Sequence, residues 1–260
     1  PAELKRESVD ITLPEVKTIT PLTFTAELLD GDKLVHTETQ SWTVFPAISA
    51  AQSVPEAINV YDPIGQTTTA LEKLGAPIKR LNSLDEPLGK ALIIGKNAFS
   101  KAIDDKLVDK LRNMVRSGGK ILVLEQEKLP EFLLPFSARM KTDGRSAITF
   151  ARAPEHPALK GIGDDELRWW GDDHLVSRNN FIKPFNGNWM IIVGAGTADG
   201  CLETPLFEEY YGDGSFILCQ HELVEKADVA PPAALLLKNL LSYLGKSQTF
   251  RPLSKSALLA

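Results

Sequence analysis

The sequence predicts an α/β fold in which helices cover both faces of a mostly parallel sheet. Between residues 58 and 126, short apolar runs alternate with amphipathic stretches. The apolar runs lie at residues 58–61, 78–81, 91–94 and 121–124, and the helical stretches at residues 67–75 and 104–117. Apolar strands that are separated by amphipathic helices indicate a parallel sheet buried on both faces.

The helix predicted over residues 104–117 has a regular pattern. Its apolar residues fall on one stripe and are Leu107, Val108, Leu111, Met114 and Val115. Gly118 and Gly119 follow, and glycine readily adopts the left-handed conformation that ends many helices. This stretch therefore reads as a surface helix with one face on the sheet.

The C-terminal part predicts further strands, a hairpin and a last helix. Strands are expected at residues 147–150 and 189–193, and residues 202–211 and 215–220 flank a Gly-Asp-Gly turn. Pro231 and Pro232 open a helix with a leucine-rich stripe. We expect residues 51–248 to form one α/β domain and residues 249–260 to be a loosely held tail.

Residues 1–50 carry no helical pattern. Alternating runs at residues 9–13, 22–28 and 34–45 predict antiparallel strands with one buried face. A β-sandwich usually needs about seven strands, so we interpret this segment as part of a sandwich. The alternative is a small β-extension packed on the following domain. The expected boundary is the linker at residues 47–55, which has prolines at its flanks.

The composition argues against several classes of partner. The net charge is −5, with acidic and basic residues interspersed, so neither nucleic acid nor a membrane surface is expected to bind. No apolar run approaches the roughly 18 residues that span a membrane. Residue 1 is Pro rather than Met, and we interpret the sequence as a piece of a longer chain whose upstream domains are its partners.

Several segments, taken in order, carry a family resemblance. They read LTFTAELLDGDKLVHTETQSWTVFP, INVYDPIG, LIIGKNAF, RSGGKILVLEQ, HPALKGIGDDELRWWGDDH, GDGSFILCQHEL and PPAALLLKNLLSYL, and cover most of residues 20–245. The first resembles the end of an immunoglobulin-like (Ig-like) domain of glycoside hydrolase family 2 enzymes. The others resemble the flavodoxin-like, class I glutamine-amidotransferase-like domains of some glycosidases, which include the trimerization domain of certain β-galactosidases. ThuA-like trehalose-utilisation proteins are also similar.

The resemblance implies a non-catalytic C-terminal accessory portion of a bacterial glycoside hydrolase, which supports assembly or shapes the sugar-binding cleft. The catalytic barrel of such an enzyme lies upstream. Carbohydrate and a second copy of the chain are then candidate partners, and a secreted or periplasmic parent is compatible with the resemblance. The alternative is a free-standing ThuA-like domain that binds or transforms a sugar-derived small molecule.

An amidotransferase would need a nucleophilic Cys on a sharp turn after the fourth parallel strand, with a His and an acid. That strand is followed by Glu125, Gln126 and Glu127, with neither Cys nor Ser among them. The pattern predicts that this chemistry is lost. Glu125 either faces the crevice where open α/β sheets bind ligands or is a solvated carboxylate at a strand end.

A dense aromatic and charged cluster is the main candidate for binding. Tryptophan faces stack on sugar rings, and carboxylates accept hydrogen bonds from hydroxyls. The candidate substrate-binding residues are Trp169, Trp170, Asp172, Asp173, His174 and, in the crevice, Glu125, with His156 nearby in the sequence. The alternatives are that the tryptophans pack the loop onto the sheet or that the adjacent acids and His bind a metal, for which three consecutive residues are poorly placed. We assign no catalytic pair and no metal site.

Two further motifs superficially suggest a catalytic pair and a nucleotide-binding loop. Cys219 and His221 share a strand face, so they are either a nucleophile–base pair or, as the missing turn and oxyanion donors favour, a buried Cys beside a satisfied His. Gly194 to Gly200 departs from the Gly-x-Gly-x-x-Gly spacing of a dinucleotide loop and opens no helix. No nucleotide and no other cofactor is therefore expected.

Overall fold

The computed structural model describes residues 8–51, 54, 56–100, 103–130, 133–134, 138–197 and 200–251. Pro55 of the predicted linker, parts of the apolar stretch at residues 129–136, residues 198–199 of the glycine-rich loop and most of the predicted tail lie outside these ranges. The chain divides into two compact units, Pro1–Ile48 and Ser49–Ala260. Within the described ranges, every helix is too short or too polar to cross a membrane.

The first unit contains one antiparallel hairpin. Strand β1 (Thr20–Asp30) pairs with β2 (Lys33–Val44), and the rings of Phe24 and Trp42 stack with their centroids 5.6 Å apart. Most residues of both strands are exposed. The strand predicted at residues 9–13 is wrong, since that segment forms no strand in the structure. An alternating pattern becomes a strand only where a neighbouring strand completes its hydrogen bonds.

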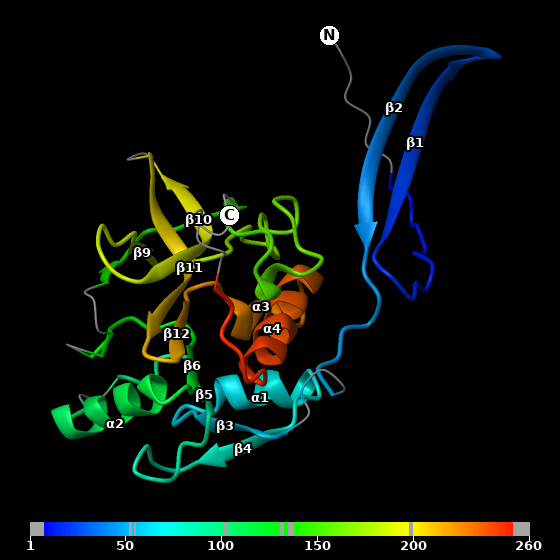
Figure 1. The fold of residues 1–260 in the computed structure, drawn as a ribbon. Coiled ribbons are helices and arrows are strands. Elements are labelled where there is room, and N and C mark those ends of the chain that lie inside the picture. The colour runs from blue at the N-terminus through cyan, green and yellow to red at the C-terminus, as the bar shows by residue number, and fades with distance from the viewer. Residues whose placement is uncertain are drawn as a thin grey trace, which may run out of the picture. The chain divides into compact units, whose positions relative to one another are not determined.

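The second unit is built on a mixed sheet, which has ten strands in the described part of the chain (Figure 1). Its parallel half has the order β4-β3-β5-β6-β12. These strands are β3 (Ile58–Tyr61), β4 (Ile78–Leu81), β5 (Ala91–Ile94), β6 (Lys120–Val123) and β12 (Gly214–Cys219). Four of the five coincide closely with apolar runs of the sequence, which confirms the predicted α/β class.

The other half of the sheet is antiparallel. It continues from β12 through β11 (Gly200–Tyr211) and β10 (Trp189–Thr197) to β8 (Thr149–Ala151). The short strands β9 (Asn180–Ile182) and β7 (Arg139–Lys141) pair beside β11. The sheet is mixed rather than mostly parallel because the strands after β6 connect through hairpins and loops instead of crossover helices.

Helices lie on both sides of the parallel half. Helix α2 (Asp105–Arg116) packs on β6 and β12, whereas α1 (Gln66–Lys73), the short α3 (Leu223–Lys226) and α4 (Pro231–Leu244) lie together, apart from α2 (Figure 1). The Asp104 carboxylate caps α2 by accepting a 2.8 Å hydrogen bond from the Leu107 backbone N–H. Gly118 follows α2 with φ of 91°, which confirms the predicted glycine end.

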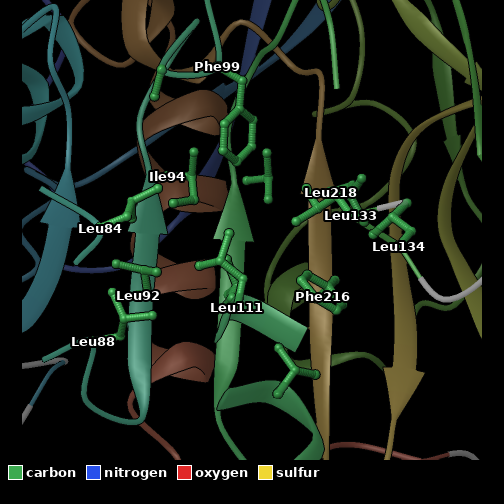
Figure 2. Close-up of a cluster of buried hydrophobic side chains, with 14 of the residues drawn as sticks. Leu84, Leu88, Leu92, Ile94, Phe99, Leu111, Leu133, Leu134, Phe216 and Leu218 are labelled. Carbon is green, nitrogen blue, oxygen red and sulfur yellow. The ribbon is translucent and has the colours of Figure 1, made fainter. Parts of the chain in front are cut away.

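Apolar side chains of α2 and of the strands that it covers form a buried core cluster (Figure 2). Leu111 and Val115 of α2 are fully buried. They pack in a cluster with alternate residues of β5, β6 and β12, namely Leu92, Ile94, Ile121, Val123, Phe216 and Leu218. The stripe predicted for α4 is also buried. Because helices cover both faces, the loops at the strand ends are the places where this unit can present a site.

Candidate functional site

A charged crevice lies at the carboxyl ends of the parallel strands. Lys96 follows β5, Glu125 follows β6, and Glu222 follows β12. Parallel strands end at one edge of a sheet, so loops that are distant in the sequence meet there. We call this region the crevice and define it by its charged lining residues, which are Lys96, Glu125, Glu127, Asp172, Asp173, Arg178, Glu222, Glu225 and Lys226.

The crevice contains two adjacent cavities. The larger has a volume of about 630 Å³, and its lining includes Asp172, Asp173 and, from α3, Glu225 and Lys226. The smaller, of about 90 Å³, lies over Glu125. The side chains of Lys96, Arg178 and Glu222 line both. The larger volume falls within the range of roughly 300–1,000 Å³ that is typical of small-molecule sites.

Glu125 is buried in the crevice beside the Lys96 ammonium and the Glu225 carboxyl. Its residue exposure is 7%, and neither carboxylate oxygen has a hydrogen bond within the described chain. The nearest cation is the Lys96 ammonium, whose Nζ is 3.9 Å from Oε1. Burial raises the pKa of Glu125 well above its ordinary value of 4.5, with Lys96 opposing the shift and Glu225 adding to it. Burial therefore favours the protonated form of the Glu125 carboxyl.

This environment makes Glu125 a source of pH-dependent instability. The folded chain keeps a proton that the unfolded chain releases above pH 4.5, so stability falls as pH rises from 4.5 through the raised folded-state pKa. The variant Glu125→Gln has no carboxyl at this position, so it does not lose stability in this way as the pH rises. We expect the variant to gain stability over the wild type by about 1.4 kcal/mol per pH unit within that window. Urea unfolding at several pH values checks this, and a variant that is less stable throughout would contradict it.

Gln126 lies in the turn after β6, where a nucleophile would stand, and it is bonded to Gln220, which follows β12. The Gln126 amide donates to the backbone oxygens of Gly95 (2.8 Å) and Leu124 (2.6 Å). Its backbone N–H donates to the Gln220 Oε1 at 3.1 Å, and the Gln220 Nε2 donates back to the Gln126 carbonyl at 3.0 Å. These bonds tie the ends of β6 and β12 together. Both glutamines are thus structural.

Cys219 and His221 form a buried, uncharged pair. The Cys219 Sγ lies 4.0 Å from the His221 Nδ1, and both residues are almost fully buried. Burial raises the pKa of the thiol and lowers the pKa of the imidazole to about 3. A thiol of high pKa beside a neutral imidazole is not an activated nucleophile.

The two adjacent tryptophans have opposite environments. Trp170 is 2% exposed, its Nε1 donates to the Glu166 carbonyl at 2.8 Å, and its ring lies 5.3 Å from the His221 ring. Trp169 is 54% exposed with φ of 54°, and the Arg168 guanidinium lies 4.7 Å from its ring centroid. The residues that line the two cavities include neither tryptophan.

Two of the predicted binding residues reach the crevice with Glu125. Asp173 pairs with Lys226 and with Arg178, whose guanidinium N is 2.6 Å away, and the hydrogen bond from Lys226 lowers the pKa of Asp173. Asp172 is exposed and lines the larger cavity. His174 stays exposed, with φ of 58°.

His156 lies away from the crevice. Its buried ring contacts Glu208 through Nε2 at 3.0 Å, and its Nδ1 accepts a hydrogen bond from the backbone N–H of Ala158, in the short 3₁₀ helix η1 (Pro157–Leu159). Both ring nitrogens are used, so His156 is a structural residue here.

The cations and acids that complete the crevice were not predicted from the sequence and are Lys96, Glu127, Arg178, Glu222, Glu225 and Lys226. Lys96 could have been identified from the sequence, because it follows a parallel strand just as Glu125 does. Arg178 and the α3 residues come from loops whose approach depends on the tertiary fold. Among the described residues, no group of three or more His, Cys, Asp or Glu side chains is placed to hold a metal.

No protein-family model matches the chain, and no curated protein matches it. Several solved structures match the fold of this chain. A β-galactosidase from Bacillus circulans sp. alkalophilus matches with a TM-score of 0.50 and 10% identity, over 74% of this chain and 31% of that chain. A β-galactosidase from Rahnella sp. R3 matches with a TM-score of 0.48 and 11% identity, over 72% and 31%. A cytoplasmic protein from Salmonella typhimurium matches with a TM-score of 0.45 and 15% identity, over 86% and 95%.

These identities are low, and the likeness to the Bacillus enzyme concerns the fold alone. The chain spans less than a third of the length of that β-galactosidase. A similar α/β fold therefore occurs as part of that β-galactosidase chain.

Proposed function

We propose that the chain is a non-catalytic accessory portion of a glycoside hydrolase, which supports assembly or shapes the sugar-binding cleft. The observation that carries the proposal is the Gln126–Gln220 pair at the turn after β6. A class I amidotransferase would have its nucleophile there, and this chain uses the position to join two strands.

The order of the parallel strands supports a flavodoxin-like domain. Read in chain order, β4-β3-β5-β6-β12 corresponds to the order 2-1-3-4-5 of flavodoxin-like folds. The resemblance of the sequence to amidotransferase-like modules of family 2-like glycosidases points the same way. The fold shared with the Bacillus β-galactosidase adds support, because that enzyme is a carbohydrate-active protein with a similar domain.

The exposed hairpin of the first unit supports the need for upstream domains. A two-stranded sheet is marginally stable alone, and three or more strands with a buried face are usually required. Nearly all of β2 is exposed. We infer that β1 and β2 belong to an Ig-like sandwich whose other strands lie in an upstream part of a longer chain.

An assay of the isolated chain on a panel of aryl glycosides tests the non-catalytic role. We expect chromophore release at the rate of a buffer blank, with circular dichroism confirming that the chain is folded. Turnover that is abolished by replacing Glu125 or Asp173 would overturn the proposal.

The assembly role makes a separate prediction. Light scattering over a wide dilution series should detect a homo-oligomer, since the similar domains of certain β-galactosidases are trimerization domains. A strict monomer at every concentration would contradict a role in self-association. The remaining accessory role would then be to shape the sugar-binding cleft.

A second candidate is a free-standing ThuA-like domain that acts on a sugar-derived small molecule. It is favoured by the partnerless Glu125 carboxyl in the crevice. The full gene product discriminates the two, because a catalytic barrel upstream of residue 1 supports the accessory role and a short protein without one supports the free-standing domain.

A further inference from the structure

We propose that the crevice binds a neutral, hydroxyl-rich small molecule of the mono- or disaccharide class, whose hydroxyls donate to Glu125 and Glu222. This goes beyond the accessory role, which needs no ligand in this unit. The proposal stands on the geometry of both cavities, because Glu125 lines the smaller one, the larger one has room for the ligand, and Glu222 lines both.

Three carboxylate oxygens in the crevice have room for a hydrogen-bond donor from a ligand. Both oxygens of Glu125 and the Oε2 of Glu222 are buried and have no hydrogen bond in the described chain. The exposures of the two residues are 7% and 4%, and both line the smaller cavity. Buried carboxylate oxygens normally accept hydrogen bonds. A ligand hydroxyl supplies the donor that this site lacks.

The balance of charges in the crevice favours a neutral ligand. The cations of the crevice already have acidic partners: Lys96 pairs with Glu225, Lys226 with Asp173, and the Arg178 Nε lies 2.5 Å from the Glu222 Oε1. Acids outnumber bases around the larger cavity. A phosphate would therefore meet excess negative charge and no unpaired lining cation. A neutral ligand avoids that repulsion and still uses the donors and acceptors of the ion pairs.

The size and polarity of the crevice fit a small saccharide. The larger cavity, of about 630 Å³, can hold a small saccharide, and its lining is mostly charged. Each saccharide hydroxyl is both a donor and an acceptor, so it can bond to a carboxylate and to an ammonium or guanidinium group. An apolar ligand would instead leave these groups without partners, which is costly.

Binding should be linked to the release of a proton. Two hydroxyls that donate to Glu125 favour its ionised form, whereas burial in the free chain favours the protonated form. The charged and titratable groups around it are Lys96 after β5, Glu127 in the loop after β6, Glu225 on α3, Cys219 at the end of β12, and the Arg178–Glu222 pair in the lining of the cavity. Affinity should therefore rise with pH, by up to about tenfold per unit, until the free carboxyl ionises.

Calorimetric titration of the 260-residue chain tests the proposal. The probes are glucose, galactose, lactose and cellobiose, with inorganic phosphate and putrescine as chemically distinct comparisons. We expect at least one saccharide to bind, and Glu125→Gln to weaken it about tenfold or more and to remove its pH dependence. The matched control is Glu155→Gln, at an exposed position, which should leave the affinity and its pH dependence unchanged.

Three outcomes would overturn the proposal: binding of phosphate or putrescine but of no saccharide, no binding of any probe, or saccharide binding that Glu125→Gln leaves as tight as in the wild type. Circular dichroism and urea unfolding of each variant show whether it is folded. A chain that binds no saccharide and hydrolyses no aryl glycoside contradicts this inference while leaving the accessory role intact.

Discussion

Replacing Trp170 by alanine is expected to lower the free energy of unfolding by about 3–5 kcal/mol. The same replacement at Trp169 should change it by no more than about 1 kcal/mol. Trp170 is buried against His221 and bonded to the Glu166 carbonyl, so its removal opens a cavity and leaves that carbonyl without a side-chain donor. Trp169 is largely exposed and contacts Arg168 at the surface.

Urea unfolding of the two single variants, followed by far-ultraviolet circular dichroism, measures this difference. The pair is internally matched, because the same side chain is removed at neighbouring positions. Equal losses would contradict the buried position of Trp170. A small loss at Trp170 together with a large loss of saccharide affinity would instead assign it to the ligand rather than to the core.

Replacing Glu208 by alanine is expected to cost about 3–5 kcal/mol, because each buried group that loses its hydrogen-bond acceptor costs about 1–3 kcal/mol. Glu208 is fully buried on β11. Its carboxylate accepts hydrogen bonds from the Ser215 Oγ and from the Tyr243 hydroxyl at 2.8 Å, and lies 3.0 Å from the His156 Nε2. Its removal leaves these three buried groups without their shared acceptor.

Ser215→Ala is the control for this prediction, since it removes one of the three bonds and leaves the carboxylate in place. We expect it to cost about 1 kcal/mol. Thermal and urea unfolding of both variants give the comparison. If Glu208→Ala and Ser215→Ala have the same small effect, the carboxylate does not organise the three groups and the account of this network is wrong.

The parallel strands and α2 could be predicted because their signals are local. The strand at residues 58–61 is an apolar run bounded by turns, and α2 has an apolar stripe, an Asp cap and a glycine end. The three-residue strands β7 and β9 could not, because so short a strand exists only through its pairing with a distant partner.

The candidate site could be predicted only in part. The rule that strand ends bind ligands located Glu125 from the sequence, and the acidic pair Asp172 and Asp173 proved to lie in the same crevice. The burial of Trp170 beside the exposed Trp169 depends on where the loop meets His221. No pattern within adjacent residues contains that information, and the same holds for the approach of Arg178 to Glu222.

The most direct test of the account is ligand-observed NMR of lactose and cellobiose with the isolated chain, followed for a day. The central claim is that the crevice binds a hydroxyl-rich molecule without cleaving it. The account predicts saturation transfer from the protein to at least one disaccharide, while the anomeric signals of the intact sugars keep their intensity. Growth of monosaccharide anomeric signals, or the absence of transfer at high sugar concentration, would contradict it.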